Sequence, residues 1–271
     1  MLVKVIQKNK KYFSVSITKN VDWWKRVETG RWEPNTFKIF DDFLSTDCIY
    51  LDIGSWIGPT VLYAAQLAKR TYAFEPDPIA YQELEVNVHA NKNTEWVSRL
   101  TIYNKAIASS SGTIKLGSRG SGGDSMSSSL FSDEKTNWEV EAITLEQLVE
   151  AEKLQDEELF IKIDIEGGEY ELIPRLKTAF HKYNVVLFLS IHPHFLMSRL
   201  IRSKGNSIRK KILRRLLFVW HQLKLVRALP FKYFYHCNGQ QRNLYVEILK
   251  ALLQGGYKTE IVATNERWNG A

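Results

Sequence analysis

The chain has 271 residues, of which 44% are hydrophobic and 25% charged, proportions typical of a globular domain rather than a disordered protein. Its two cysteines, with no Cys-x-x-Cys pair and no His/Cys metal spacing, argue against a disulfide framework and a structural zinc site. No apolar run approaches the ~20 residues of a membrane-spanning helix, and the first residues lack the apolar core of a signal peptide, so we expect a cytoplasmic protein.

The net charge of +7 is distributed unevenly along the sequence. Of the 37 Lys and Arg residues, 15 lie between Leu172 and Val246, a stretch without Asp or Glu. The rest of the chain therefore carries 22 basic and 30 acidic residues. A net acidic body with one strongly basic region favours binding of a specific anionic partner over nonspecific binding to many anionic molecules.

The first 45 residues predict an extension made of a hairpin and two helices. Residues 1–20 alternate as two short strands around a Lys/Asn turn. Helices are expected over 21–27 and 35–44, and Asn35 is a good N-cap for the second.

From residue 48 onwards, strands alternate with helices, which predicts a mostly parallel sheet covered on both faces. The segment 136–143 alternates in the manner of an edge strand. The expected strands are 48–53, 71–74, 100–108, 159–165, 185–191 and 257–263, and the expected helices are 59–69, 78–91, 145–153 and 243–254.

A Gly/Ser-rich segment interrupts this alternation over 117–129, where ten of thirteen residues are Gly or Ser. Its composition suits a lid that closes over a substrate, and equally a solvated surface loop.

Residues 206–229 predict an amphipathic helix with an apolar stripe and a basic first half. Such a helix could lie on an anionic membrane surface, shape a pocket for a phosphate-bearing or lipid-linked sugar, or pack on the sheet with a solvated basic face. Nucleic acid is the least favoured partner, because no RNA-binding motif accompanies the charge. The apolar stripe comprises Ile208, Ile212, Leu213, Leu216, Val219, Trp220, Leu223 and Val226, and the basic cluster comprises Arg209, Lys210, Lys211, Arg214 and Arg215.

A glycine turn follows the first buried strand, in the segment Tyr50-Leu-Asp-Ile-Gly-Ser-Trp-Ile-Gly58. A dinucleotide fingerprint would need glycine where the chain has Trp56 and Pro59, and a phosphate-binding P-loop would need a Gly-Lys-Ser/Thr ending that is missing. The acid at Asp52, close to the glycines, suits a positively charged ligand better than a pyrophosphate.

A second acid, Glu75, ends the next strand, 23 residues after Asp52. A carboxylate at that position can accept both hydroxyls of an adenosine ribose. A cationic adenosine cofactor held by a glycine turn and an acid describes S-adenosyl-L-methionine. The alternative is that the glycines only make a tight connection and that Glu75 is a solvated surface acid.

These segments resemble the FkbM family of methyltransferases over about residues 20–195. The resemblance implies a class I (Rossmann-like) methyltransferase fold that uses S-adenosyl-L-methionine to methylate hydroxyl groups of sugars or natural products. The matching pieces are Trp32-Glu33-Pro34, the glycine turn, Phe74-Glu-Pro76, Leu84-x-x-Asn87-x-x-x-Asn91, Asn104-x-Ala-Ile107 with Gly112, and Ile161-Lys-Ile-Asp-Ile-Glu-Gly-Gly-Glu169.

The resemblance also implies a set of cofactor-binding residues. Asn104 and Ala106 would flank the adenine, and Trp56 stands where the family often has Asn. The other implied contacts are Asp52, Gly54, Ser55, Gly58 and Glu75.

Asp164 and Glu166 follow an apolar strand, and His192 follows the next one, so the fold should place them side by side. A hydroxyl is a poor nucleophile while protonated, and we expect His192 to act as the general base, with the two acids positioning base or substrate. A rival role is divalent metal binding by Asp164, Glu166 and a histidine, for example of Mg²⁺. In a third reading, the segment Glu166-Gly-Gly-Glu169 only caps the following helix.

We therefore expect one α/β domain over 1–271, with an extension (1–45), a cofactor-binding core (46–194), a basic helical insertion (195–240) and a closing helix and strand (241–271). Its expected activity is O-methylation of a carbohydrate, glycoconjugate or related natural product, with a small-molecule or glycan acceptor that is anionic or lipid-linked. The alternatives are an RNA methyltransferase using the basic segment, and a membrane-associated protein that keeps the fold without catalysis. Peripheral membrane contact would occur through 206–229.

Overall fold

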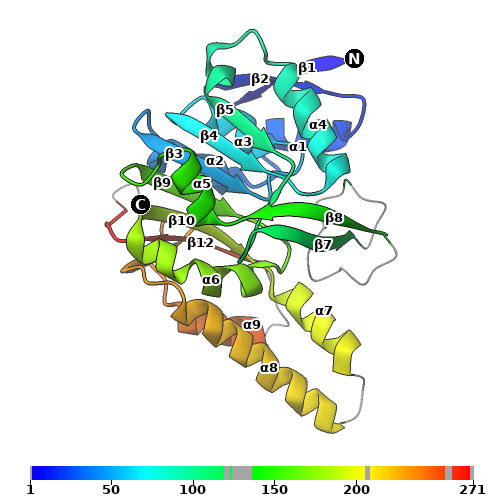
Figure 1. The fold of residues 1–271 in the computed structure, drawn as a ribbon, viewed down its shortest axis with the longest axis vertical. Helices are drawn as coiled ribbons and strands as arrows, with labels where there is room; N and C mark the ends of the chain where they lie inside the picture. Colours follow the sequence, from blue (N-terminus) through cyan, green and yellow to red (C-terminus); the bar gives the residue numbers. More distant parts are fainter. Residues whose placement is uncertain (1, 119–122, 124–135, 205–207, 254–257, 269–271) are drawn as a thin grey trace.

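The computed structural model describes residues 2–118, 123, 136–204, 208–253 and 258–268. At its centre is a seven-stranded sheet with the order β11-β12-β10-β9-β3-β4-β5, in which β12 runs antiparallel to both neighbours and the other pairs are parallel (Figure 1). The expected mostly parallel sheet is confirmed. Its strands are β3 Cys48–Ile53, β4 Arg70–Phe74, β5 Leu100–Tyr103, β9 Glu158–Ile163, β10 Asn184–Ile191, β11 Tyr233–His236 and β12 Thr259–Thr264.

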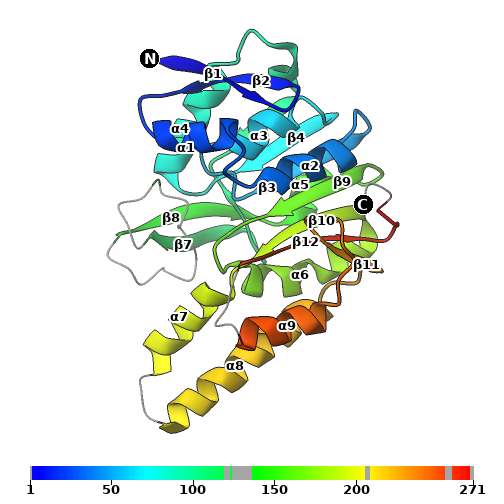
Figure 2. The same ribbon diagram turned by 180° about the vertical axis from the view of Figure 1, so that it is seen from behind.

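Helices cover both faces of the sheet, so its central strands are buried on both sides. In β3, Ile49 and Leu51 pack with α5, α6 and α8, whereas Cys48 and Tyr50 pack with α1, α2 and α3. Figures 1 and 2 show these two layers from opposite sides. The helices are α1 Val21–Glu28, α2 Pro34–Phe43, α3 Pro59–Ala64, α4 Pro78–His89, α5 Leu145–Ala151, α6 Glu169–Lys182, α7 Pro193–Lys204, α8 Ile208–Arg227 and α9 Leu244–Leu253, with a 3₁₀ turn at Glu95–Arg99.

The predicted N-terminal hairpin is confirmed as β1 Val3–Lys8 and β2 Lys11–Ser16, and Asn87 of α4 and Asn91 just after this helix tie it to the body. The side-chain carbonyl of Asn87 accepts the backbone N–H of Ser16 at 2.8 Å, and its amide donates to the carbonyl of Ile57 at 2.9 Å. Asn91 bonds both backbone groups of Ser14. The two asparagines of the family-like motif therefore join the hairpin to the helix and to the glycine turn.

The start of α2 differs from the prediction. The helix begins at Pro34 with Glu33 as its N-cap residue, so Asn35 lies inside it and is not the cap. Proline fits the first helical position because its fixed φ suits the helix and its missing N–H would have no partner there.

The single strand expected over 100–108 is split between two sheets. β5 ends at Tyr103, and β6 Ala106–Ile107 joins a separate three-stranded sheet with β7 Gly112–Ser118 and β8 Thr136–Ile143. Between them, the side-chain amide of Asn104 donates to the carbonyl of Glu75 at 2.8 Å, which holds the chain where it turns. The segment 136–143 is therefore the middle strand of the order β6-β8-β7, not an edge strand.

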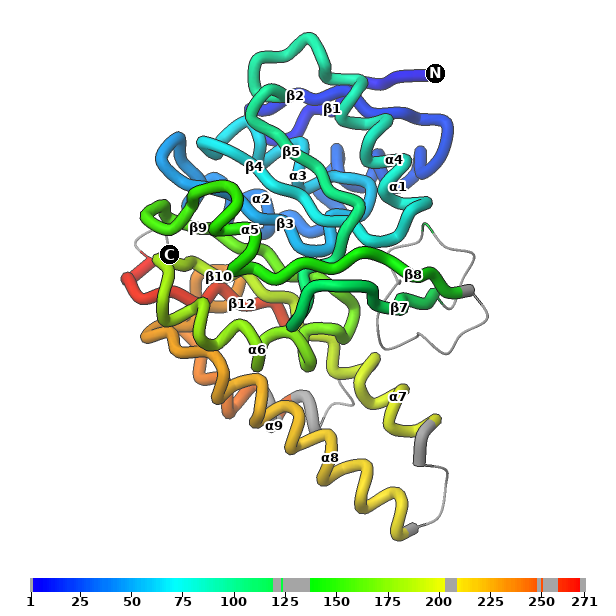
Figure 3. The backbone as a smooth tube through the Cα atoms, in the orientation of Figure 1, coloured from blue at the N-terminus to red at the C-terminus, as the bar shows by residue number. Residues whose placement is uncertain are grey.

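The basic insertion differs from the expected 195–240. It consists of two helices, α7 and α8, of which only the second was predicted, and it ends before β11, which forms an edge of the main sheet. The four residues of β11 are too short a run for alternation to mark a strand. The tube in Figure 3 follows α7 and the first half of α8 beyond the sheet.

The Gly/Ser segment expected over 117–129 lies mostly outside the described residues. Gly117 and Ser118 belong to β7, and Gly123 accepts a hydrogen bond from the Trp56 indole nitrogen at 3.0 Å. Among the described residues, no helix is long and apolar enough to cross a bilayer.

We predict that Asn87→Ala lowers the free energy of unfolding by about 2–4 kcal/mol, because it leaves a buried N–H and a buried carbonyl without partners. Chemical denaturation measures the change, and Glu85→Ala, an exposed position on the same helix, is the control. Equal stability of the two variants would show that Asn87 does not hold the hairpin.

Candidate functional site

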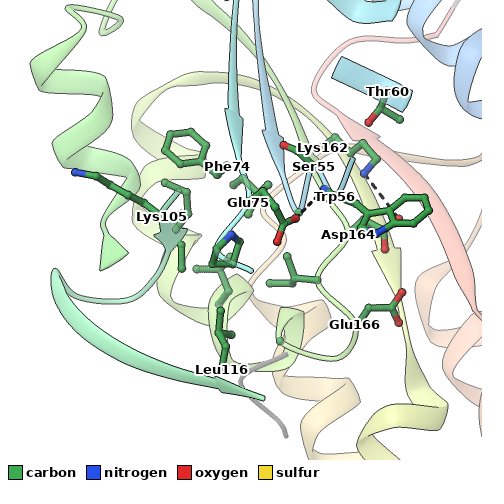
Figure 4. Close-up of a pocket in the computed structure, with 18 of the residues that line it drawn as sticks. Ser55, Trp56, Thr60, Phe74, Glu75, Lys105, Leu116, Lys162, Asp164 and Glu166 are labelled. Carbon is green, nitrogen blue, oxygen red and sulfur yellow. Dashed lines mark hydrogen bonds and ion pairs between the residues drawn. The ribbon is translucent and has the colours of Figure 1, made fainter. Parts of the chain in front are cut away.

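A cavity of 430 Å³ lies at the carboxyl ends of β3, β4 and β9, where open α/β sheets bind their ligands. Figure 4 shows Glu75, which follows β4, and Asp164 and Glu166, which follow β9, at this cavity. Trp23, Trp32 and Trp56 contribute to one wall, with ring centroids 4.9 Å apart for Trp23 and Trp56. The cavity therefore combines carboxylates with an aromatic surface.

The glycine turn forms the floor of the cavity. Gly54 has a φ of +90°, and a Cβ there would lie 2.1 Å from the carbonyl oxygen of Asp164. Its N–H donates to the carbonyl of Phe74 at 3.0 Å, so one residue contacts the ends of both neighbouring strands. Glycine is required at this position because the backbone just after the neighbouring strand β9 occupies the space that a side chain would need.

Glu75 is buried beside this turn and lines the cavity. One carboxylate oxygen accepts the N–H of Trp56 at 2.7 Å, and the other accepts the N–H of Asp77 at 2.8 Å. Burial raises the pKa of Glu75 to about 8, although these two hydrogen bonds act in the opposite direction. The alternative of a solvated surface acid is therefore wrong for Glu75.

Asp52 lies under the turn and does not line the cavity. Its side chain is fully buried; one oxygen accepts the hydroxyls of Tyr50 and Thr60 at 2.8 and 2.6 Å. The other oxygen lies 3.4 Å from the ammonium nitrogen of Lys162. The Asp52 carboxylate is therefore not in place for the expected direct contact, because it is fully buried and does not line the cavity.

The remaining predicted cofactor residues divide into two groups. Ser55 and Ala106 line the cavity, whereas Gly58 packs against Leu84 and Asn104 holds the carbonyl of Glu75. Only the first group is in place for direct contact with a ligand.

The acids Asp164 and Glu166 lie together with His192, as the strand order predicted. The Nε2 atom of His192 is 3.4 Å from Oδ1 of Asp164 and 3.7 Å from Oε2 of Glu166. Both acids line the cavity, while His192 is 2% exposed and lies behind them.

The three side chains differ in protonation. Burial raises the pKa of Glu166 to about 7. Burial also acts to raise the pKa of Asp164, but Lys162 and Lys258 outweigh it and hold that pKa below its usual range. For His192, burial lowers the pKa, and the contact with Glu169 and the nearby carboxylates outweigh burial and raise it to about 9.

The expectation that His192 is the general base needs correction. A base must reach the proton that it removes and must be unprotonated at the working pH. Asp164 and Glu166 line the cavity but His192 does not, so His192 is not in place to reach an acceptor there. Its position suits a residue that holds the two acids in place.

Two lysines complete the site, and the sequence pattern gave a signal for only one of them. Lys162 is the one charged residue in the otherwise apolar run 159–163, which marks it as unusual. Lys258 comes from the end of the chain and lies 2.7 Å from Glu33, 2.9 Å from Glu260 and 3.4 Å from Asp164. No local pattern around Lys258 indicated this contact.

Comparisons with known proteins agree with the family-like motifs. The family model described as "Methyltransferase FkbM domain" matches residues 52–218, more than half of the chain. A search of curated protein sequences gives no match.

The solved structures that match this chain include several methyltransferases. Methyltransferase FkbM from Methylobacillus flagellatus KT is 15% identical, with a TM-score of 0.44, over 81% of this chain and 44% of that one. M. jannaschii TYW2 in complex with AdoMet is 11% identical, with a TM-score of 0.42, over 96% of this chain and 84% of that one. Geranyl diphosphate C-methyltransferase from Streptomyces coelicolor A3(2) is 8% identical, with a TM-score of 0.40, over 93% and 83%. The chain thus spans less than half the length of the first of these structures.

Proposed function

The chain belongs to the FkbM methyltransferase family, whose methyl donor is S-adenosyl-L-methionine, and we propose that the donor binds in the cavity at the carboxyl ends of β3, β4 and β9. We further propose that the acceptor is a hydroxyl group of a carbohydrate, glycoconjugate or related natural product. The observation that carries the proposal is that the glycine turn, Glu75 and the pair Asp164/Glu166 all border one cavity.

The residues at the cavity fit the chemistry of the donor. Glu75 offers a carboxylate to the two ribose hydroxyls, and the backbone at Gly54 and Ser55 allows close approach because no side chain at Gly54 intervenes. The acids Asp164 and Glu166 favour the positive charge of a sulfonium. Asp52 contributes indirectly, by holding the turn from below.

A bound donor would supply an activated methyl group: the acceptor oxygen would bond to the methyl carbon as the carbon–sulfur bond breaks, and the hydroxyl proton would pass to the carboxylate of Glu166 at the cavity. Holding the reacting groups in contact can contribute about 7–11 kcal/mol to such a displacement. In our proposal, Asp164 and Glu166 hold the acceptor hydroxyl, and His192 positions their carboxylates from behind.

We predict that Glu75→Gln weakens S-adenosyl-L-methionine binding roughly 10- to 100-fold at pH 8.5, because a hydrogen bond to a charged acceptor is lost. The Glu75 pKa of about 8 means that protonation competes with binding at lower pH. Wild-type affinity should therefore rise from pH 6 through pH 8 and level off near pH 9, and the variant should lack this dependence.

Isothermal titration calorimetry measures both effects, with Glu83→Gln, a carboxylate outside the cavity, as the control. A folded wild-type sample that does not bind the donor contradicts the proposed function. Donor binding that is unchanged in Glu75→Gln contradicts the role of this residue.

We predict that the methyl group is transferred to oxygen. The protein is incubated with the donor and with one candidate acceptor at a time: a monosaccharide, a nucleotide sugar or a lipid-linked sugar. The release of S-adenosylhomocysteine is measured, and NMR locates the methyl group in the product. The matched control is the same acceptor lacking the methylated hydroxyl, which should release none. Methylation of a nitrogen or carbon atom, or methylation of RNA alone, would contradict the proposed transfer to a hydroxyl oxygen of these acceptors.

A second proposal concerns where the acceptor is found: we infer that α8 contacts an anionic membrane surface. Leu216 and Trp220 are 62% and 53% exposed, with Ile212 one turn earlier at 57%, so an apolar stripe faces outwards. Exposed basic residues border this stripe, namely Arg209, Lys210, Lys211 and Arg215. Exposed apolar side chains among cations favour lipid over nucleic acid, because the phosphate backbone of RNA offers no apolar phase.

We predict that the chain sediments with phosphatidylglycerol vesicles and that Leu216→Glu/Trp220→Glu reduces the bound fraction several-fold. Each basic residue near the surface contributes about 1 kcal/mol, so binding should also fall with salt. Val5→Glu, at an exposed apolar residue of β1, is the control. Binding to RNA but not to vesicles would instead support the nucleic-acid alternative.

A further inference from the structure

Three potential metal ligands converge at the carboxyl ends of β9 and β10. One ligand atom each from Asp164, Glu166 and His192 lies within 4.8 Å of the other two. We propose that these three side chains bind a divalent first-row transition-metal cation of the Mn²⁺ type. The three residues come from two adjacent parallel strands, so the fold itself brings them together.

Two of the atoms that face one another in this cluster lack hydrogen bonds. Within the described part of the chain, Nε2 of His192 and Oδ1 of Asp164 have no hydrogen-bond partner. His192 is 2% exposed, and buried polar atoms are normally satisfied because water no longer solvates them. A cation between the three side chains would satisfy Nε2 of His192 and Oδ1 of Asp164 together.

The spacing of the cluster suits ligands around an ion. Ligands about 2.1 Å from a metal lie about 3.0 Å apart at octahedral angles and about 3.4 Å apart at tetrahedral angles. The distances from His192 Nε2 are 3.4 Å to Asp164 and 3.7 Å to Glu166. The three ligand atoms all lie within 4.8 Å of one another, so the side chains would move closer together on binding one ion.

The histidine is oriented from its other side by a buried carboxylate. Oε1 of Glu169 lies 3.4 Å from Nδ1 of His192 and accepts the backbone N–H of the same residue at 2.6 Å. Oε2 of Glu169 accepts the N–H of Gly167 at 2.7 Å, which fixes the carboxylate. A carboxylate behind the imidazole is the usual support of a metal-binding histidine, because it fixes the ring and the tautomer.

The nearby lysines leave the inner oxygen of Asp164 available. Lys162 and Lys258 approach Oδ2 of Asp164, at 3.8 and 3.4 Å, whereas Oδ1 faces His192. The charge of Lys258 is also shared with Glu33 and Glu260. Two carboxylates and an imidazole can therefore meet a dication without two ammonium groups pointing into the site.

The ligand set selects the class of ion. Carboxylate oxygens suit Mg²⁺ and Mn²⁺, while an imidazole nitrogen favours transition metals over Mg²⁺ or Ca²⁺. Because Asp164 and Glu166 line the cavity, an ion held by them would keep open positions towards the acceptor. A hydroxyl on such an ion loses its proton more readily. This catalytic role rests on the proposed function; the binding of the ion does not.

Titration with Mn²⁺, followed by electron paramagnetic resonance, tests the site. The signal of the free ion decreases in intensity as Mn²⁺ binds to the protein. A single saturable Mn²⁺ per chain is expected. Glu166→Gln and His192→Ala should each weaken its affinity at least about tenfold. Glu166 is partly exposed, so its variant remains informative if the buried His192→Ala does not fold. Glu158→Gln, an exposed acid at the opposite end of β9, should bind Mn²⁺ like the wild type.

No saturable Mn²⁺ binding, or equal affinity in Glu166→Gln and the wild type, would overturn the proposed site. Calorimetry with S-adenosyl-L-methionine in the presence of a chelator separates the two proposals. Donor binding without Mn²⁺ binding overturns the metal site and leaves the proposed function intact. Mn²⁺ binding without donor binding overturns the proposed function and leaves the metal site intact.

Discussion

The buried ammonium group of Lys162 is the contact on which the geometry of the site depends. It lies 3.4 Å from Asp52 in β3 and 3.8 Å from Asp164 just after β9, with a side chain 5% exposed. Removing one partner of a buried ion pair leaves an uncompensated charge and typically costs ~3–5 kcal/mol. The two strand ends also approach so closely that the backbone of Asp164 fills the space beside Gly54. Charge and contact together fix the glycine turn against the acidic edge of the cavity.

Because Lys162 holds Asp52 and Asp164 in place, the acids of the site have different roles. Asp52 is enclosed by protein donors and can only support the turn, whereas Glu75 faces the cavity and keeps a raised pKa because it is buried without a cationic partner. At the other side, Asp164 faces two lysines, which keep it ionised, while Glu166 is left with burial as the main influence on its pKa. Carboxylates within one cavity thus receive different protonation states from their neighbours.

The sequence predicted the parts of the site that follow from strand ends. Gly54, Glu75 and the adjacency of Asp164 and His192 follow from the rule that parallel strands present their carboxyl ends at one edge. The sequence pattern did not indicate the direction of the Asp52 side chain, because a strand buried on both faces shows no alternation of apolar and polar residues. Lys258 could not be found either, since an antiparallel strand from the end of the chain delivers it, and its register is set by tertiary packing. The long-range register, rather than any local motif, completes the acidic edge.

The uneven charge of the chain gains a physical interpretation from this arrangement. The acid-free stretch begins at Leu172, directly after Glu169 and Glu171, and among the described residues none of its basic side chains lines the cavity. A cationic donor is favoured by the carboxylates of the body, while an anionic partner is favoured by the exposed cations of α8. Because α7 and the first half of α8 extend beyond the sheet, their charge acts at a distance from the carboxylates and does not cancel them. The carboxylates at the cavity and the exposed cations of α8 are therefore two separate charged surfaces, and each is available to a partner of the opposite charge.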